Sequence, residues 1–172
     1  LDDIAEALMD TLPEDRIETH ARQTGFVKRE RKIDPVAFFW VLILGYGISA
    51  QQTLVALKRD YERATGLTLS DGSWHARFKP ELVDFLHLCV VDAIEHSAQR
   101  QTRKLSAKLS RFEDVLIQDS TIIRLHESLA KTWPAARSKK VAAGIKVSTL
   151  ISAVSAGPKR VEVHAENTSE IK

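Results

Sequence analysis

Apolar residues recur at helical spacing through the first part of the chain and at strand spacing through the last part. The helical spacing predicts helices over about 14–24, 36–44, 49–64 and 70–78, followed by a long helix that opens at Pro80. From about residue 112, short runs rich in Val, Ile and Thr replace this pattern and are typical of strands. The chain is therefore expected to be mainly helical over 1–111 and to form strands after that.

Local signals set the expected ends of these elements. Asp34 followed by Pro35 predicts a helix start, because an Asp side chain can cap free backbone amides and Pro fits the first helical turn. Gly45 and Gly47 are expected to end that helix, which is apolar nearly all round and should lie at the centre of a small core. The long helix keeps its apolar period as far as Leu109, so it is expected to continue to that point.

The last strands are expected to form a half-buried hairpin. Residues 143–156 are rich in Val, Ile, Ser and Thr, and a turn signal at Gly157-Pro158 follows them. Over 160–166 the polarity alternates strictly. One face of this strand carries Val161, Val163 and Ala165, and the other carries Glu162, His164 and Glu166. The acidic face is interpreted as solvated.

Composition narrows the class of protein. The chain has 172 residues, a formal charge of +2 and 44% hydrophobic residues, which excludes global disorder. No apolar run is long enough to span a membrane, and the one cysteine, Cys89, excludes a disulfide framework and a cysteine zinc site. Without a leader sequence, a reducing cytoplasm is the expected location. The chain begins with Leu and stops at Lys172 within a predicted strand, so both ends are expected to be cut.

The net charge of +2 is the sum of separate acidic and basic patches. Residues 97–112 contain five basic residues and no acid, and residues 28–32 contain four basic residues and one acid. If the long helix continues, its basic residues at spacings of four, four and three share one face, which is made by Arg100, Lys104, Lys108 and Arg111. Such a face suits phosphate groups, and a solvated helix surface is the alternative.

Asp119 is the sharpest single feature of the chain. It lies within a predicted apolar strand, where alternation places it on the same face as Ile117 and Ile123. A carboxylate in such a place must be paired, bind a metal ion or lie at the end of the strand, because burying it bare costs several kcal/mol. The strand-end alternative would have Asp119 form a turn or cap with Ser120 and Thr121.

Several segments together resemble one known family. They are Lys28–Pro35, Ser73–Phe78, Leu116–His126, Trp133-Pro134-Ala135 and Ala142–Val147. Their order and residue types are similar to those of insertion-sequence transposases of the DDE type, family four in the usual naming. The resemblance covers nearly the whole chain. It implies a helical DNA-binding and dimerising region over 1–111, and over 112–172 the start of an α/β RNase H-like catalytic domain, truncated after its first three antiparallel strands.

The resemblance also implies a chemistry and a partner. Asp119 is similar to the first catalytic Asp of the family, in which three carboxylates hold two Mg²⁺ or Mn²⁺ ions about 3.5–4 Å apart. The second Asp and the final Glu lie further downstream in the family and have no counterpart here. The metal is therefore expected only in the full-length enzyme, and this chain alone is predicted not to cleave DNA. The expected partner is double-stranded DNA at transposon ends, a homodimer is compatible with the resemblance, and no membrane is involved. The resemblance also implies a prokaryotic cytoplasm and association with the nucleoid.

The predicted helices over 49–64 and 70–78, joined by a short link, are typical of a helix-turn-helix-like arrangement. In the second helix, His75 and Arg77 are the predicted groove contacts, whereas Trp74 and Phe78 are expected in the core. The other predicted DNA contacts are Arg100, Arg103, Lys104, Lys108 and Arg111. Two alternatives stay open: a truncated, non-catalytic DNA-binding protein that inhibits transposition, and a helical interaction domain that does not bind nucleic acid.

Overall fold

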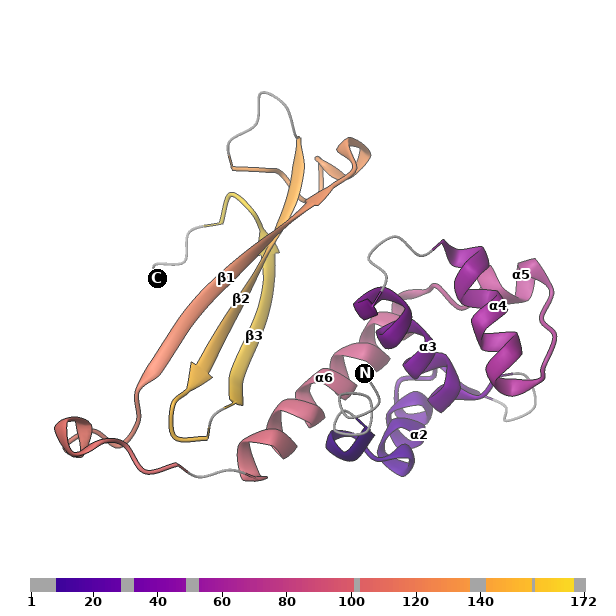
Figure 1. The fold of residues 1–172 in the computed structure, drawn as a ribbon. Helices are drawn as coiled ribbons and strands as arrows, with labels where there is room; N and C mark the ends of the chain where they lie inside the picture. Colours follow the sequence, from indigo (N-terminus) through magenta and orange to yellow (C-terminus); the bar gives the residue numbers. More distant parts are fainter. Residues whose placement is uncertain are drawn as a thin grey trace. The chain divides into compact units, whose positions relative to one another are not determined.

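The computed structural model describes residues 9–28, 33–48, 53–100, 103–136, 142–155 and 157–168. It divides into two compact units, Leu1–Ala93 and Ile94–Lys172. The division falls inside a long helix, whereas the predicted domain boundary follows the change from helix to strand. The helices of the first unit and the sheet of the second can be followed in Figure 1.

Five described helices carry the fold of the first unit. They are α2 (Glu14–Gln23), α3 (Pro35–Ile48), α4 (Leu54–Thr65), α5 (Asp71–His75) and the first part of α6 (Pro80–Arg100). α3 packs against both α2 and α4. Part of the residues that precede α2, and the stretches 29–32 and 49–52, lie outside the described residues.

The predicted start and stop signals operate at several helix ends. The carboxylate of Asp34 accepts hydrogen bonds from the amides of Val36 and Ala37 at 2.9 and 3.0 Å, which confirms its role as a cap. Gly66 ends α4 in the left-handed conformation at φ 69°, and its amide bonds to the carbonyl of Glu62. Local hydrogen bonding therefore decides these boundaries, which is why sequence signals find them.

Phe38 of α3 lies at the centre of an aromatic core. Its fully buried ring contacts the rings of Phe26, Tyr61 and Trp74 at centroid distances of 5.2, 6.1 and 5.1 Å. Trp74 is 1% exposed, and Phe78 packs against the same cluster, so the expectation that both belong to the core is confirmed. Burying these rings, together with the aliphatic residues of the same cluster, stabilises this unit.

The predicted ends of α3 and of the long helix α6 are wrong, as are the predicted start of α4 and the predicted end of α5. α3 continues through Gly45 and Gly47 to Ile48, because glycine only lowers helix propensity and the apolar run before it is held by the core. The long helix ends at Arg100 and does not continue to Leu109. At Ser106 the backbone is extended, with φ −59° and ψ 158°, and a short 3₁₀ turn at Ala107–Leu109 follows. Apolar periodicity does not register such a break.

The second unit is built on a three-stranded antiparallel sheet. Its strands are β1 (Leu116–Leu125), β2 (Ala143–Ser152) and β3 (Gly157–Ala165), and β2 lies between the other two (Figure 1). The predicted hairpins are thus confirmed, with a register irregularity between Leu150 and Ile151. A mainly helical unit followed by this sheet is compatible with a partial α/β domain.

Much of the apolar surface of the sheet is open among the described residues. Ile117 and Ile123 of β1 are 53% and 46% exposed, and Val163 of β3 is 52% exposed. The strands are therefore less buried than their Val and Ile content predicts. Among the described residues, no helix is both long and apolar enough to cross a membrane.

Candidate catalytic strand and DNA-binding residues

Asp119 lies within β1 and not at its end. It is the fourth residue of the ten in the strand and pairs in register with Thr149 of β2. Its carboxylate is exposed, and no hydrogen bond or ion pair is recorded for it within the described residues. The strand-end alternative is therefore wrong. The expected burial is wrong as well, because no described segment covers β1 at this point.

The surroundings of Asp119 are apolar. The register places it on one face with Ile117, Thr121 and Ile123, and with Val147 and Thr149 of β2. The β3 residues on this face are Val161, Val163 and Ala165. Among the strand residues that the structure describes, Asp119 is thus the one acid on its face. A single carboxylate supplies one ligand of a metal site and does not complete one.

A second carboxylate, Asp114, anchors the start of β1. The hydroxyl of Ser152 donates to it at 2.7 Å, the amide of Val154 donates at 3.2 Å, and the Lys159 ammonium lies 3.1 Å away. These groups, led by the Ser152 hydrogen bond, lower the pKa of Asp114 to about 2. Its oxygens are therefore engaged in tying β1 to the β2–β3 turn, which is a structural role.

Glu166 corrects the prediction of a solvated acidic face on β3. It is 5% exposed, and its carboxylate pairs with the Arg124 guanidinium of β1. The side chain reaches Arg124 by crossing Gly144 of β2, which faces Arg124 in the register and has no side chain to block the path. The alternation of polar and apolar residues misses this burial, because it depends on a glycine in the neighbouring strand.

The expected basic helix face does not form. Arg103, Lys104, Lys108 and Arg111 follow the end of α6, and their side chains are exposed. The amide of Arg103 donates to the carbonyl of Val154 at 2.6 Å, and the Arg111 guanidinium lies 4.9 Å from the centroid of the Phe112 ring. Arg100 is the last residue of α6, and its side chain lies outside the described residues. These cations line an exposed segment that leads into β1, without the regular spacing of a helix.

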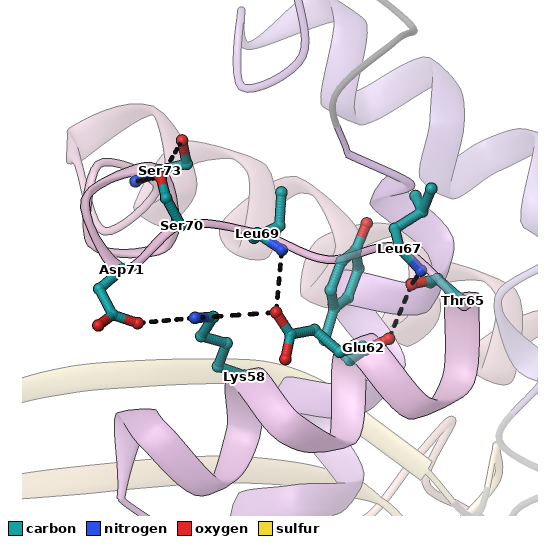
Figure 2. A network of polar contacts seen from close by, with 9 residues as sticks. Lys58, Glu62, Thr65, Leu67, Leu69, Ser70, Asp71 and Ser73 are labelled. Carbon is teal, nitrogen blue, oxygen red and sulfur yellow. Dashed lines mark hydrogen bonds and ion pairs between the residues drawn. The ribbon is translucent and has the colours of Figure 1, made fainter.

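The pair α4 and α5 is held by a polar network (Figure 2). The Lys58 ammonium of α4 bonds to the Asp71 carboxylate of α5 at 2.6 Å and lies 3.7 Å from the Glu62 carboxylate. Glu62 in turn accepts the amide of Leu69 at 2.9 Å, within the link between the two helices. The contact with Lys58 lowers the pKa of Asp71 and raises that of Lys58. The network therefore links α5 and the segment that precedes it to α4.

The two predicted groove contacts lie in different surroundings. His75 is exposed at the end of α5, whereas Arg77 is half-buried in the segment before α6. The Nε atom of Arg77 is enclosed and has no hydrogen-bond partner among the described residues. α5 has 5 residues, which is shorter than the predicted helix over 70–78. The segment 28–32 is described only at Lys28, which is exposed.

Comparison with known proteins supplies the functional class. The chain is 31% identical over 144 residues to the transposase for insertion sequence element IS231C of Bacillus thuringiensis subsp. berliner, a match that covers 83% of this chain. The transposases for IS231B of the same subspecies and for IS231D of subsp. finitimus are each 28% identical, over 131 and 144 residues.

The chain is homologous to insertion-sequence transposases. The match covers 30% of the length of the IS231C transposase and 27% of the IS231B transposase, so the chain spans about a third or less of these relatives. No protein-family model and no solved structure matches the chain. The resemblance to insertion-sequence transposases is thus confirmed, whereas the DDE type and family four stay predictions.

Proposed function

We propose that the chain is part of a DDE-type DNA transposase that binds transposon ends and carries the first metal-binding carboxylate of an RNase H-like domain. The homology to insertion-sequence transposases supports the class. The position of Asp119 supports the role of that residue, since its exposed carboxylate lies inside a strand, on one face with Ile117, Ile123 and Val147, and has no hydrogen bond or ion pair among the described residues.

DNA binding is assigned to a few basic residues in each unit. They are His75 and Arg77 in the first unit and Arg100, Arg103, Lys104, Lys108 and Arg111 in the second. His75, Arg77 and the cations between α6 and β1 are exposed or half-buried. No ion pair ties these cations within the described residues, so they are available to phosphate oxygens. Contacts of this kind give affinity that falls with salt and carry no sequence information. The helical unit supplies the helix pair α4 and α5, and its aromatic core keeps that pair rigid.

The metal belongs to the proposal for the complete enzyme. Carboxylate oxygens suit Mg²⁺ and Mn²⁺, and Asp119 offers one carboxylate. Within the described residues, no group of three His, Cys, Asp or Glu side chains lies close enough together to hold a metal ion. The residues present fit one ligand of a two-metal site and not a complete site, so the chain by itself is expected to bind DNA without cutting it.

A DNA-binding titration tests the first part of the proposal. The purified chain is mixed with a fluorescein-labelled duplex, and anisotropy is recorded between 50 and 200 mM salt, a range over which six to ten phosphate contacts lower affinity by about 10³–10⁵. A steep, linear fall of log affinity with log salt supports the proposal. An absence of binding at the lowest salt contradicts it and favours the helical interaction domain.

A nicking assay tests the second part. Supercoiled plasmid is incubated with the chain and Mg²⁺ or Mn²⁺, with Asp119→Ala as the comparison and Glu113→Ala, at an exposed position ahead of β1, as the matched carboxylate control. The expected result is no nicking by any of the three proteins. Metal-dependent nicking that Asp119→Ala abolishes would show a complete site in this chain and would refute its predicted inactivity.

A further inference from the structure

The first unit contains a small basic cavity in which three cations converge. It has a volume of about 250 Å³ and is lined by the apolar ring of Phe26 and by Gly25, Lys28, Ala76, Arg77, Lys79 and Glu81. Its walls come from the turn after α2, the segment after α5 and the first turn of α6. Ligand pockets for drug-sized molecules start at about 300 Å³, so this cavity suits a smaller group.

None of the three cations has a counter-ion among the described residues. Lys28 and Lys79 are exposed, and neither forms an ion pair or side-chain hydrogen bond there. Arg77 is half-buried, and its enclosed Nε has no hydrogen-bond partner. An enclosed guanidinium N–H without an acceptor loses its hydration and gains no hydrogen bond in return, which is unfavourable. Other cations of this unit do have a carboxylate partner, such as Arg16 with Asp92 at 2.6 Å.

The one acid in the cavity wall has a separate explanation. Glu81 lies in the first turn of α6, where a carboxylate interacts favourably with the positive end of the helix dipole. The same end of this 21-residue helix also favours an external anion. Three cations against one carboxylate leave the cavity with a net positive charge.

We infer that this cavity binds one phosphate of the DNA backbone, with Arg77, Lys28 and Lys79 as its ligands. The inference rests on the proposed function for the identity of the anion as a DNA phosphodiester. Arg77 gives the planar, fixed donor that suits phosphate oxygens, and the two lysines add mobile charge at the rim. Arg77 is thereby a backbone contact that positions the helix pair, in place of the base contact suggested by the sequence.

The larger cavity of the same unit provides an internal contrast. It measures about 650 Å³, and Glu14, Glu18 and Asp34 face a single cation, Arg22. Its excess of carboxylates repels phosphate. Cavity size alone would therefore select the wrong site, and the sign of the lining charge decides between the two.

Two measurements on the full 172-residue chain test the inference. In the first, inorganic phosphate is added at constant ionic strength, with chloride as the reference, while amide chemical shifts are recorded by NMR. The amides of Gly25 and Ala76 are expected to shift with phosphate in the native chain and not in Arg77→Gln. In the second, duplex affinity is measured against salt for Lys28→Gln, Arg77→Gln and Lys79→Gln.

The DNA experiment has a matched control. Arg59 of α4 is exposed and unpaired among the described residues, and it does not line the cavity. Arg77→Gln is expected to weaken binding about tenfold at low salt. Its log affinity–log salt slope should become shallower by about 0.9, the value for one lost phosphate contact, whereas Arg59→Gln should leave both unchanged. Lys28→Gln and Lys79→Gln replace exposed side chains, so these variants should fold as the native chain does. Each is expected to weaken binding and flatten the salt slope, by less than Arg77→Gln. They therefore test the cavity even if Arg77→Gln does not fold.

The other outcomes distinguish a failure of the cavity assignment from a failure of the proposed function. DNA binding with native slope in all three cavity variants, together with no phosphate-dependent shift, overturns the cavity assignment and leaves the proposed function standing. Phosphate-dependent shifts without any DNA binding overturn the DNA phosphodiester as the ligand and the proposed function with it. Equal losses in Arg77→Gln and Arg59→Gln indicate unspecific loss of charge and overturn the cavity assignment.

Discussion

Replacing Gly144 by Ala should destabilise the sheet through a residue on another strand. A Cβ at this position would collide with the carboxylate oxygen of Glu166 and lie 3.4 Å from its Cδ and 3.5 Å from its Cβ. The Glu166 carboxylate is 4% exposed and pairs with Arg124, so it has no free space into which to move without losing that partner. The substitution is therefore expected to break the cross-sheet pair.

The magnitude follows from two opposing effects. Losing a hydrogen bond to a charged group costs about 1.5–3 kcal/mol, and the lower end applies because Arg124 is 51% exposed. Replacing Gly by Ala at a compatible strand position stabilises by about 0.4–1 kcal/mol through the unfolded chain. The net destabilisation should be about 1 kcal/mol. In the Glu166→Ala background the collision is absent, so the same substitution should stabilise by about 0.5 kcal/mol.

Native-state hydrogen exchange measures both effects in one sample. Amides of β2 and β3 should exchange about fivefold faster in Gly144→Ala, and about twofold slower when Gly144→Ala is added to Glu166→Ala. Amides of α3 and α4 belong to the other unit and serve as the internal reference. If Gly144→Ala changed the exchange rates by the same factor and in the same direction with and without Glu166→Ala, the claim that Glu166 needs a glycine at position 144 would be refuted.

Three further predictions concern the helical unit. Hydrogen bonds from Arg16, ahead of other effects, lower the pKa of Asp92 to about 2, below its usual 3.8, so Asp92→Asn should cost about 1 kcal/mol of unfolding free energy at pH 7. This difference should vanish as the pH falls from about 4 to about 2 in urea titrations; a constant difference would contradict it. The Tyr61 hydroxyl accepts the amide of Asp34 at 2.9 Å, so Tyr61→Phe should cost about 1 kcal/mol in the same assay, and unchanged stability would remove this bond from the account. Burial raises the pKa of Cys89 to about 12, so iodoacetamide should label it only after unfolding, and prompt labelling of the folded chain would show that the site is open.

The success of sequence-based prediction in this chain follows the range of the interactions. Asp34, Gly66 and Pro80 mark helix ends through contacts within one or two turns, and the structure places the ends where these residues predict. The buried positions of Trp74 and Phe78 follow from the apolar pattern in the same way. Local signals fail at Gly45, where core packing outweighs the low helix propensity of glycine.

The same contrast between local signals and tertiary packing applies to the candidate site. The placement of Asp119 on one strand face with Ile117 and Ile123 follows from alternation alone, and the register confirms it. Its exposure could not be predicted from alternation, because exposure depends on which segments pack over β1. The predicted helix face of Lys104, Lys108 and Arg111 is wrong, since α6 ends at Arg100 and the backbone is extended at Ser106, although these side chains are exposed.

The sequence by itself determined the order of elements, the apolar core residues, the strand face of Asp119 and the resemblance to insertion-sequence transposases. Only the tertiary structure decided that Glu166 is buried across Gly144, that Asp114 ties the start of β1 to a distant turn, and that Lys28 lies in one cavity wall with Arg77 and Lys79. The physical reason is that periodicity and capping act over a few residues, whereas charge pairing and cavity formation join residues that only the fold brings together.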